Sequence, residues 1–227
     1  MPKSSPKRLL VIGAHPDDET FGCGGTIALE VDRGTEVTVC CLTGSTSRQR
    51  ELTAACKVLG AKSIALKEKD LSLRVLEVTN ALIPTIQEIQ PQVIISHSDN
   101  DYHPDHQVAH KAFLRAAEWA SHSTQYHEKA WRPQRLYTME INNLLAEPTV
   151  LVDISESIDK KRQAIAEYQS QLEKTSDYYQ SFNLQKARLR GLQGRCEFAE
   201  AFQEVLMPVQ GPFYHPSPTV KTIFGDF

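Results

Sequence analysis

The chain has 227 residues, of which 41% are hydrophobic and 23% charged, a composition typical of a globular protein. Its net charge of −3 and scattered Lys and Arg residues give no reason to expect nucleic acid or an anionic membrane as a partner. No stretch approaches the roughly 20 apolar residues that span a bilayer, and the basic N-terminus lacks the apolar run of a signal peptide. We therefore expect a cytoplasmic protein without an integral membrane segment.

The five cysteines form no C-x-x-C pair, and their odd number argues against a disulfide framework. Zinc binding by cysteine normally needs closely spaced pairs of cysteines. We expect these residues to be small buried hydrophobes in a reducing compartment.

Short β-rich runs alternate with helical patterns over the first 120 residues. The predicted strands are 8–14, 36–43, 63–66 and 92–97, and the predicted helices are 20–33, 47–59, 72–89 and 105–120. Such alternation predicts an α/β fold with a Rossmann-like, mostly parallel sheet that carries helices on both faces.

The pattern changes in the last third of the chain. Two further strands are predicted at 136–141 and 149–154, at an edge of the sheet, and helices at 156–172 and 178–205, the second with a break at 191–194. From residue 207, four prolines predict an irregular tail that wraps a surface or reaches a neighbouring subunit, so a homo-oligomer is an expectation. We expect a single domain over 1–227, with a core at about 7–125, a C-terminal portion at about 135–206 and a tail at about 207–227.

Two compact clusters of His and Asp each follow an apolar run. His15-Pro16-Asp17-Asp18-Glu19 comes directly after residues 9–14, and His103-Pro104-Asp105-His106 comes shortly after residues 93–96. Ligand sites of open α/β sheets gather at the carboxyl ends of the strands. The two clusters therefore predict one shared metal site.

The residue types in the two clusters fit a catalytic metal. His15 and Asp18 are three residues apart at a strand-to-helix turn, and His106 could complete a set of three ligands that leaves one position open. Two imidazoles and a carboxylate suit zinc or another divalent transition metal. Asp17 would remain free as a general base, while His103 could donate a proton or stabilise an oxyanion and Asp105 could orient an imidazole.

Simpler interpretations exist for each residue alone. An acidic pair after a strand is often a helix N-cap, and a histidine at a strand end is often a solvated loop residue. The coincidence of two clusters at two strand ends favours the metal site. The glycines at 13, 22, 24 and 25 do not fit the dinucleotide pattern G-x-G-x-x-G, and no G-x-S-x-G nucleophile elbow is present.

The two clusters, Ala14-His15-Pro16-Asp17-Asp18-Glu19 and Asp101-Tyr102-His103-Pro104-Asp105-His106, resemble the LmbE/PIG-L superfamily of zinc-dependent N-deacetylases. The resemblance extends over nearly the whole chain. Supporting matches are Thr43-Gly44, Arg48, Glu51, Leu59-Gly60, Asp70 and Glu200-Ala201-Phe202. Members of this superfamily remove acetyl groups from N-acetylglucosaminyl compounds.

The resemblance implies a role for each matching residue. His15, Asp18 and His106 would bind zinc, and Asp17 would be the base. His103 would serve the tetrahedral intermediate or the leaving amine, and Asp105 would tune a neighbouring histidine. Sugar hydroxyls would be held by Arg48 and Asp70.

This chain departs from the family in a late helix, where it has Tyr168-Gln169-Ser170-Gln171 in place of the His-x-Ser-Gln of some members. A tyrosine keeps a polar tip but cannot replace an imidazole as ligand or acid–base group at neutral pH. The sequence therefore leaves substrate recognition on that side open.

The predicted function is the zinc-dependent deacetylation of an N-acetylated amino sugar, a small-molecule N-acetylglucosaminyl conjugate. Two alternatives are a metal-dependent amidase acting on a non-sugar amide and a non-catalytic zinc-binding protein. Retention of Asp17, which is not a ligand in this scheme, argues against the second alternative because metal storage needs no spare base.

Overall fold

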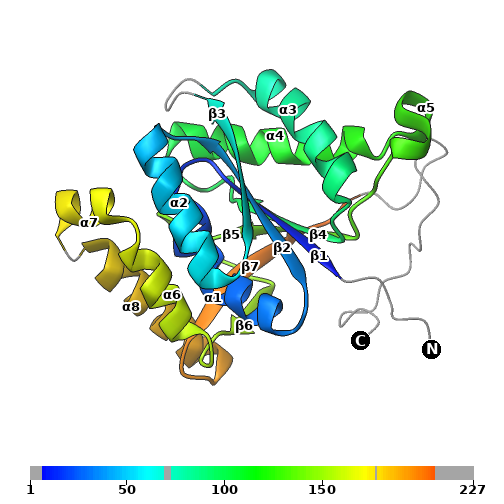
Figure 1. Ribbon diagram of the computed structural model, residues 1–227. Coiled ribbons are helices and arrows are strands. Elements are labelled where there is room, and N and C mark those ends of the chain that lie inside the picture. The colour runs from blue at the N-terminus through cyan, green and yellow to red at the C-terminus, as the bar shows by residue number, and fades with distance from the viewer. Residues whose placement is uncertain (1–6, 69–72, 177, 208–227) are drawn as a thin grey trace.

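A computed structural model describes residues 7–68, 73–176 and 178–207 (Figure 1). Within these ranges one sheet has the strand order β3-β2-β1-β4-β5-β7-β6. The strands are β1 (Arg8–Gly13), β2 (Glu36–Thr43), β3 (Lys62–Glu68), β4 (Val93–His97), β5 (Arg135–Met139), β6 (Val150–Asp153) and β7 (Ala199–Val205). The first five in chain order pair in parallel, whereas β7 is antiparallel to both β5 and β6. The prediction of a mostly parallel sheet is confirmed.

Helices cover both faces of the sheet, as predicted (Figure 1). α3 (Val75–Ile89) and α4 (Pro104–Ala120) lie on one face, and α1 (Asp18–Asp32), α2 (Thr46–Leu59), α6 (Ile158–Ala166) and α8 (Tyr178–Gly194) lie on the other. Residues of β1 alternate between two cores, since Leu9 and Val11 pack on the α1 side and Leu10 and Ile12 on the α4 side. The nearly continuous apolar run of β1 is thus explained by burial on both faces.

Helix α1 lies unusually close to the sheet because it carries glycines on the packed side. A Cβ atom on Gly22 would lie 2.5 Å from Sδ of Met139, and one on Gly25 would lie 2.6 Å from Cδ1 of Ile154. The helix is also kinked at Cys23, where φ is −148°. The kink divides α1 into a short first segment, which begins at Asp18, and a longer second segment.

The helix predicted for 178–205 is wrong over its last third. α8 ends at Gly194, near the predicted break, and Arg195 takes a positive φ of 58°. Residues 199–205 then form β7, between β5 and β6. Ala, Glu and Gln favour a helix locally, but the open edges of β5 and β6 supply backbone partners that outweigh this preference.

Two other predictions for the last third need correction. The helix predicted at 156–172 is divided into α6 and α7 (Gln169–Thr175), because the chain turns at residues 167–168. Of the two strands expected at an edge, β6 is at the edge but β5 lies inside the sheet. Short elements that the sequence did not predict, α5 (Ser123–Tyr126) and η1 (His127–Lys129), follow α4.

The cysteines are free; four are buried and Cys196 is partly buried, in agreement with the prediction. No helix in the described ranges is long and apolar enough to cross a bilayer. The predicted tail from residue 207 lies, after that residue, outside the described residues.

Candidate metal centre and active site

Strands β1 and β4 bring the two clusters together. The two strands are parallel neighbours, with Leu9 opposite Val93 and Val11 opposite Ile95, so their carboxyl ends meet at one edge of the sheet. The strand order also reverses between them, because β2 and β3 lie on one side and β5 on the other. This point of reversal is where open α/β sheets form their binding crevices.

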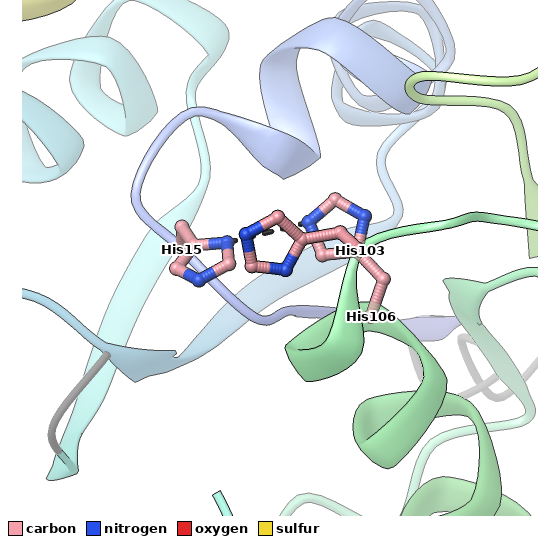
Figure 2. Close-up of side chains that lie close together, drawn as sticks. All are labelled: His15, His103 and His106. Atoms are coloured by element: carbon pink, nitrogen blue, oxygen red, sulfur yellow. Dashed lines mark hydrogen bonds between the residues drawn. The ribbon is translucent and has the colours of Figure 1, made fainter. Parts of the chain in front are cut away.

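The side chains of the three predicted metal ligands lie close together, and Figure 2 shows the rings of His15 and His106 facing each other. Nδ1 of His15 lies 3.3 Å from Nε2 of His106 and 3.5 Å from Oδ2 of Asp18, and Nε2 of His106 lies 3.4 Å from Oδ1 of Asp18. Two ligand atoms of a tetrahedral zinc site, each about 2.0–2.1 Å from the metal, are roughly 3.3 Å apart. The donor atoms therefore fit three corners of a zinc site.

Further potential ligands border this set. His15, His103 and His106 form one group whose donor atoms lie within 4.8 Å of one another, and Asp18, His97 and His106 form another. His97, the last residue of β4, was not among the predicted site residues, although a histidine at the end of an apolar strand was a usable signal. Nε2 of His97 accepts the backbone N–H of Ala14 at 2.8 Å, and burial lowers the pKa of this ring to about 4. We infer that the His97 ring is neutral and holds the end of β1 through this hydrogen bond.

Two carboxylates orient the predicted histidine ligands from behind. Oδ2 of Asp105 lies 3.1 Å from Nε2 of His15, and Oδ2 of Asp101 lies 3.0 Å from Nδ1 of His106. The amide of Asn142, after β5, donates to Oδ1 of Asp101 at 3.1 Å. Carboxylates in such positions fix the tautomer and increase the basicity of a metal-binding imidazole. Asp101 and Asn142 were missed as site residues; Asp101 lies within the second motif, but no local pattern marks Asn142.

Asp18 controls the protonation of both histidine ligands. Burial lowers the pKa of each ring, but hydrogen bonding and charge from Asp18, with help from Asp105 or Asp101, raise the pKa of His15 to about 9 and that of His106 to about 10. Burial raises the pKa of Asp18, but the charge and hydrogen bond of His106 and the hydrogen bond of His15 lower it well below its usual value. Without a cation, protons on the two rings balance the carboxylates of this site.

Asp17, the predicted base, is buried beside the ligand set in an unusual backbone conformation. Its φ is 125°, a region that a residue with a Cβ adopts only when its surroundings enforce it. Nη2 of Arg48 donates to its Oδ2 at 2.8 Å and also to the carbonyl oxygen of Pro16. Burial and the neighbouring Asp18 raise the pKa of Asp17 well above its usual value, although Arg48 opposes the shift. The carboxyl group is therefore more basic than an exposed aspartate.

His103 is the N-cap of α4, and its ring lies 4.7 Å, between centroids, from both His15 and His106 (Figure 2). Its Nδ1 accepts the backbone N–H of Asp105 at 3.2 Å. A neutral ring must therefore carry its proton on Nε2. Partial burial and the neighbouring histidines lower the pKa of His103, so the neutral form prevails near pH 7.

Of the two residues predicted to bind sugar hydroxyls, the structure describes only Arg48. Arg48 lies at the site, but its guanidinium contacts Asp17, Pro16 and Glu51. Asp70 lies outside the described residues. Tyr168, which replaces the family's histidine, is buried and donates its hydroxyl hydrogen to Glu19, the residue after Asp18.

Comparisons with known proteins relate the chain to N-deacetylases. Residues 10–117 match the family model described as PIG-L: GlcNAc-PI de-N-acetylase. The chain is 30% identical over 190 residues to a probable N-acetyl-α-D-glucosaminyl L-malate deacetylase 2 of Bacillus cereus, covering 74% of this chain and 84% of the relative. It is 31% identical over 180 residues to a 1D-myo-inositol 2-acetamido-2-deoxy-α-D-glucopyranoside deacetylase of Rhodococcus erythropolis, covering 59% of this chain and 61% of that relative.

Solved structures share the fold at lower sequence identity. An N,N′-diacetylchitobiose deacetylase from Pyrococcus horikoshii superposes with a TM-score of 0.79 at 22% identity, covering 88% of this chain and 84% of that one. GalB, the 4-carboxy-2-hydroxymuconate hydratase of Pseudomonas putida, superposes with a TM-score of 0.81 at 24% identity, covering 90% and 98%. The sequence match to the Bacillus deacetylase, together with the family model, shows that the chain belongs to the PIG-L (LmbE-like) family of N-deacetylases.

Proposed function

We propose that this protein is a zinc-dependent hydrolase that removes the acetyl group from an N-acetylglucosaminyl conjugate. The observation that carries the proposal is that the two ring nitrogens of His15 and His106 lie 3.3 Å apart and each lies 3.4–3.5 Å from one oxygen of the Asp18 carboxylate, next to a buried carboxyl group that is not part of the set. A site that only stores metal has no use for the additional carboxyl group of Asp17.

A divalent cation held by His15, Asp18 and His106 would polarise an amide carbonyl and lower the pKa of a water molecule. Asp17 is the group that takes the proton of the attacking water. Its raised pKa suits this role, because a general base is most effective when its pKa approaches the working pH. Arg48 holds one carboxylate oxygen, Oδ2, and thereby fixes the direction of the other.

His103 acts from beside His15 and His106. With Nδ1 engaged by the backbone of Asp105, its Nε2–H is the ring's hydrogen-bond donor. A donor at this place stabilises the negative charge that develops on the amide oxygen. The proton that Asp17 has accepted is available for the departing amine.

The substrate class rests on the relatives. The Bacillus protein is named for a malate conjugate of N-acetylglucosamine and the Rhodococcus protein for an inositol conjugate, so the shared part is the acetamido sugar. We propose the same part for this chain, with Arg48 and Asp70 as candidate contacts to its hydroxyl groups.

The test is free-amine release by zinc-loaded protein from a panel of N-acetylglucosaminyl conjugates and simple N-acetyl amides, with a chelator control. Chelator-sensitive release from the sugars alone supports the proposal. Release from non-sugar amides supports a general metal-dependent amidase instead. If zinc is bound and nothing in the panel is cleaved, the proposed activity is wrong for this panel and a non-catalytic role gains support.

A further inference from the structure

The backbone at Asp17 is held by Glu19. Oε2 of Glu19 accepts the N–H of Asp17 at 3.2 Å, and its Oε1 accepts the hydroxyl groups of Thr20, at 2.5 Å, and Tyr168. Glu19 and Tyr168 have no exposed surface. The contacts on Oε1 fix the carboxylate plane, so the other oxygen remains directed at the N–H of Asp17.

The side chain of Asp17 is held by a second, separate chain of contacts. Nη2 of Arg48 donates to Asp17, and Nε of Arg48 lies 3.8 Å from Oε2 of Glu51. Glu51 in turn accepts two hydrogen bonds from Ser170, from its backbone N–H at 2.8 Å and from its hydroxyl at 2.7 Å. Glu51, which lies within ion-pair distance of Arg48 but accepts no hydrogen bond from its Nε, is therefore anchored to Ser170.

Both chains of contacts begin at the same place in the fold, the start of α7. Tyr168 is the N-cap of this helix and Ser170 is its second residue, and no residue within α7 itself is buried. We propose that Tyr168 and Ser170 are positioning residues for the general base, Tyr168 through Glu19 to the Asp17 backbone and Ser170 through Glu51 and Arg48 to the Asp17 carboxylate. The expected effect on kcat rests on the proposed function, whereas the positioning of Asp17 by these contacts does not.

The strained conformation of Asp17 is the physical reason that such support is needed. A residue with φ of 125° is expected to relax when its contacts are removed, and relaxation moves its carboxylate away from the metal ligands. A shift of about 1 Å in a catalytic group can cost roughly a hundredfold in rate. The tyrosine that replaces the family's histidine thus has a function as a hydrogen-bond donor, which needs no imidazole.

The decisive variant is Tyr168→Phe, which removes only the hydroxyl group, with Tyr137→Phe as the matched control. Tyr137 lies in β5, outside the ligand set, and its hydroxyl accepts from Arg135 at 3.3 Å. We expect Tyr168→Phe to lower kcat roughly ten- to a hundredfold, with KM and bound zinc close to wild type and the protein folded at the assay temperature. Hydrogen exchange in residues 15–19 should accelerate in this variant and stay unchanged in the control.

Two further variants separate positioning from general stability. If Tyr168 acts through Glu19, adding Tyr168→Phe to Glu19→Gln costs little beyond Glu19→Gln alone. Ser170→Ala, which removes the hydroxyl contact to Glu51, should lower kcat by itself. In the double variant with Tyr168→Phe, the fold-decreases in kcat of the two single variants should multiply, because the two chains of contacts are separate.

The proposal is overturned if exchange in residues 15–19 is unchanged in Tyr168→Phe, or if the loss of kcat follows a loss of zinc or of folded protein at the assay temperature. It is also overturned if Tyr168→Phe and Glu19→Gln act independently. If the wild-type protein cleaves nothing in the panel, the proposed function fails, and the exchange measurement on zinc-loaded protein still decides whether the start of α7 holds Asp17.

Discussion

Oδ2 of Asp101 lies 3.0 Å from Nδ1 of His106, on the side of the ring away from Asp18. Asp105 stands in the same relationship to His15, with 3.1 Å between Oδ2 and Nε2. Each of the two predicted histidine ligands therefore has its own carboxylate partner. These two contacts show that the motif around His103 supports both strands of the site and not only its own.

Asp101→Asn and Asp105→Asn should each weaken zinc binding about 10- to 100-fold. Without its carboxylate partner, the imidazole of His106 or His15, respectively, becomes less basic and less well oriented. Competition with a zinc chelator measures this affinity. Asp99→Asn, in the same loop but exposed, is the control and should bind zinc like the wild type. Equal affinities in all three variants would contradict the assignment.

Asp17→Asn should retain zinc and lose about 10²- to 10⁴-fold in kcat, because an amide cannot accept the proton of the attacking water. The substitution keeps an oxygen that can accept from Arg48, so the fold around the site is preserved. Metal analysis and amine release on the same sample make the comparison. Turnover at the wild-type level would rule out Asp17 as the base.

Zinc affinity should increase with pH. The pKa values of His15 and His106 are raised to about 9 and about 10, so below pH 9 both rings hold protons that the cation must displace. Each displaced proton contributes about a tenfold gain in affinity per pH unit, and the gain ends as the pH passes through the raised pKa values. Titrations between pH 6 and 9, in buffers with different ionisation enthalpies, measure both the slope and the protons released. A flat profile would contradict the raised pKa values.

Lys161→Met should destabilise the fold by about 3–5 kcal/mol, because it leaves Glu200 buried without a counter-charge. Nζ of Lys161 lies 2.5 Å from Oε1 of Glu200, whose carboxylate also accepts the N–H groups of Gly25 and Thr26 just beyond the kink of α1. Urea unfolding measures the loss.

The neighbouring Lys160→Met is the control for this prediction. Lys160 pairs with Asp32 at the surface, and exposed ion pairs contribute only about 0–1 kcal/mol. If both variants lower the free energy of unfolding by a similar amount, the buried position of the Lys161–Glu200 pair does not matter for stability.

The sequence by itself determined the first two-thirds of the fold and the two clusters at the centre of the candidate site. Apolar runs such as residues 9–12, followed by helical spacing and glycine stops, are local signals that tertiary contacts reinforce. His15, Asp17 and Asp18 follow β1, and His103, Asp105 and His106 follow β4, so the rule that ligand sites gather at the carboxyl ends of parallel strands was enough to predict one shared site. The pairing of each histidine with a particular carboxylate did not follow, because it depends on side-chain rotations.

Only the tertiary structure decided the last third of the chain and the surroundings of Asp17. Residues 199–205 are helix formers by composition and become β7 because β5 and β6 leave their backbone groups open. Tyr168 is 149 residues from Glu19, and Ser170 is 119 residues from Glu51. No local pattern encodes contacts of this range, since they arise where the start of α7 meets Glu19 and Glu51, and they lie next to the strained backbone of Asp17.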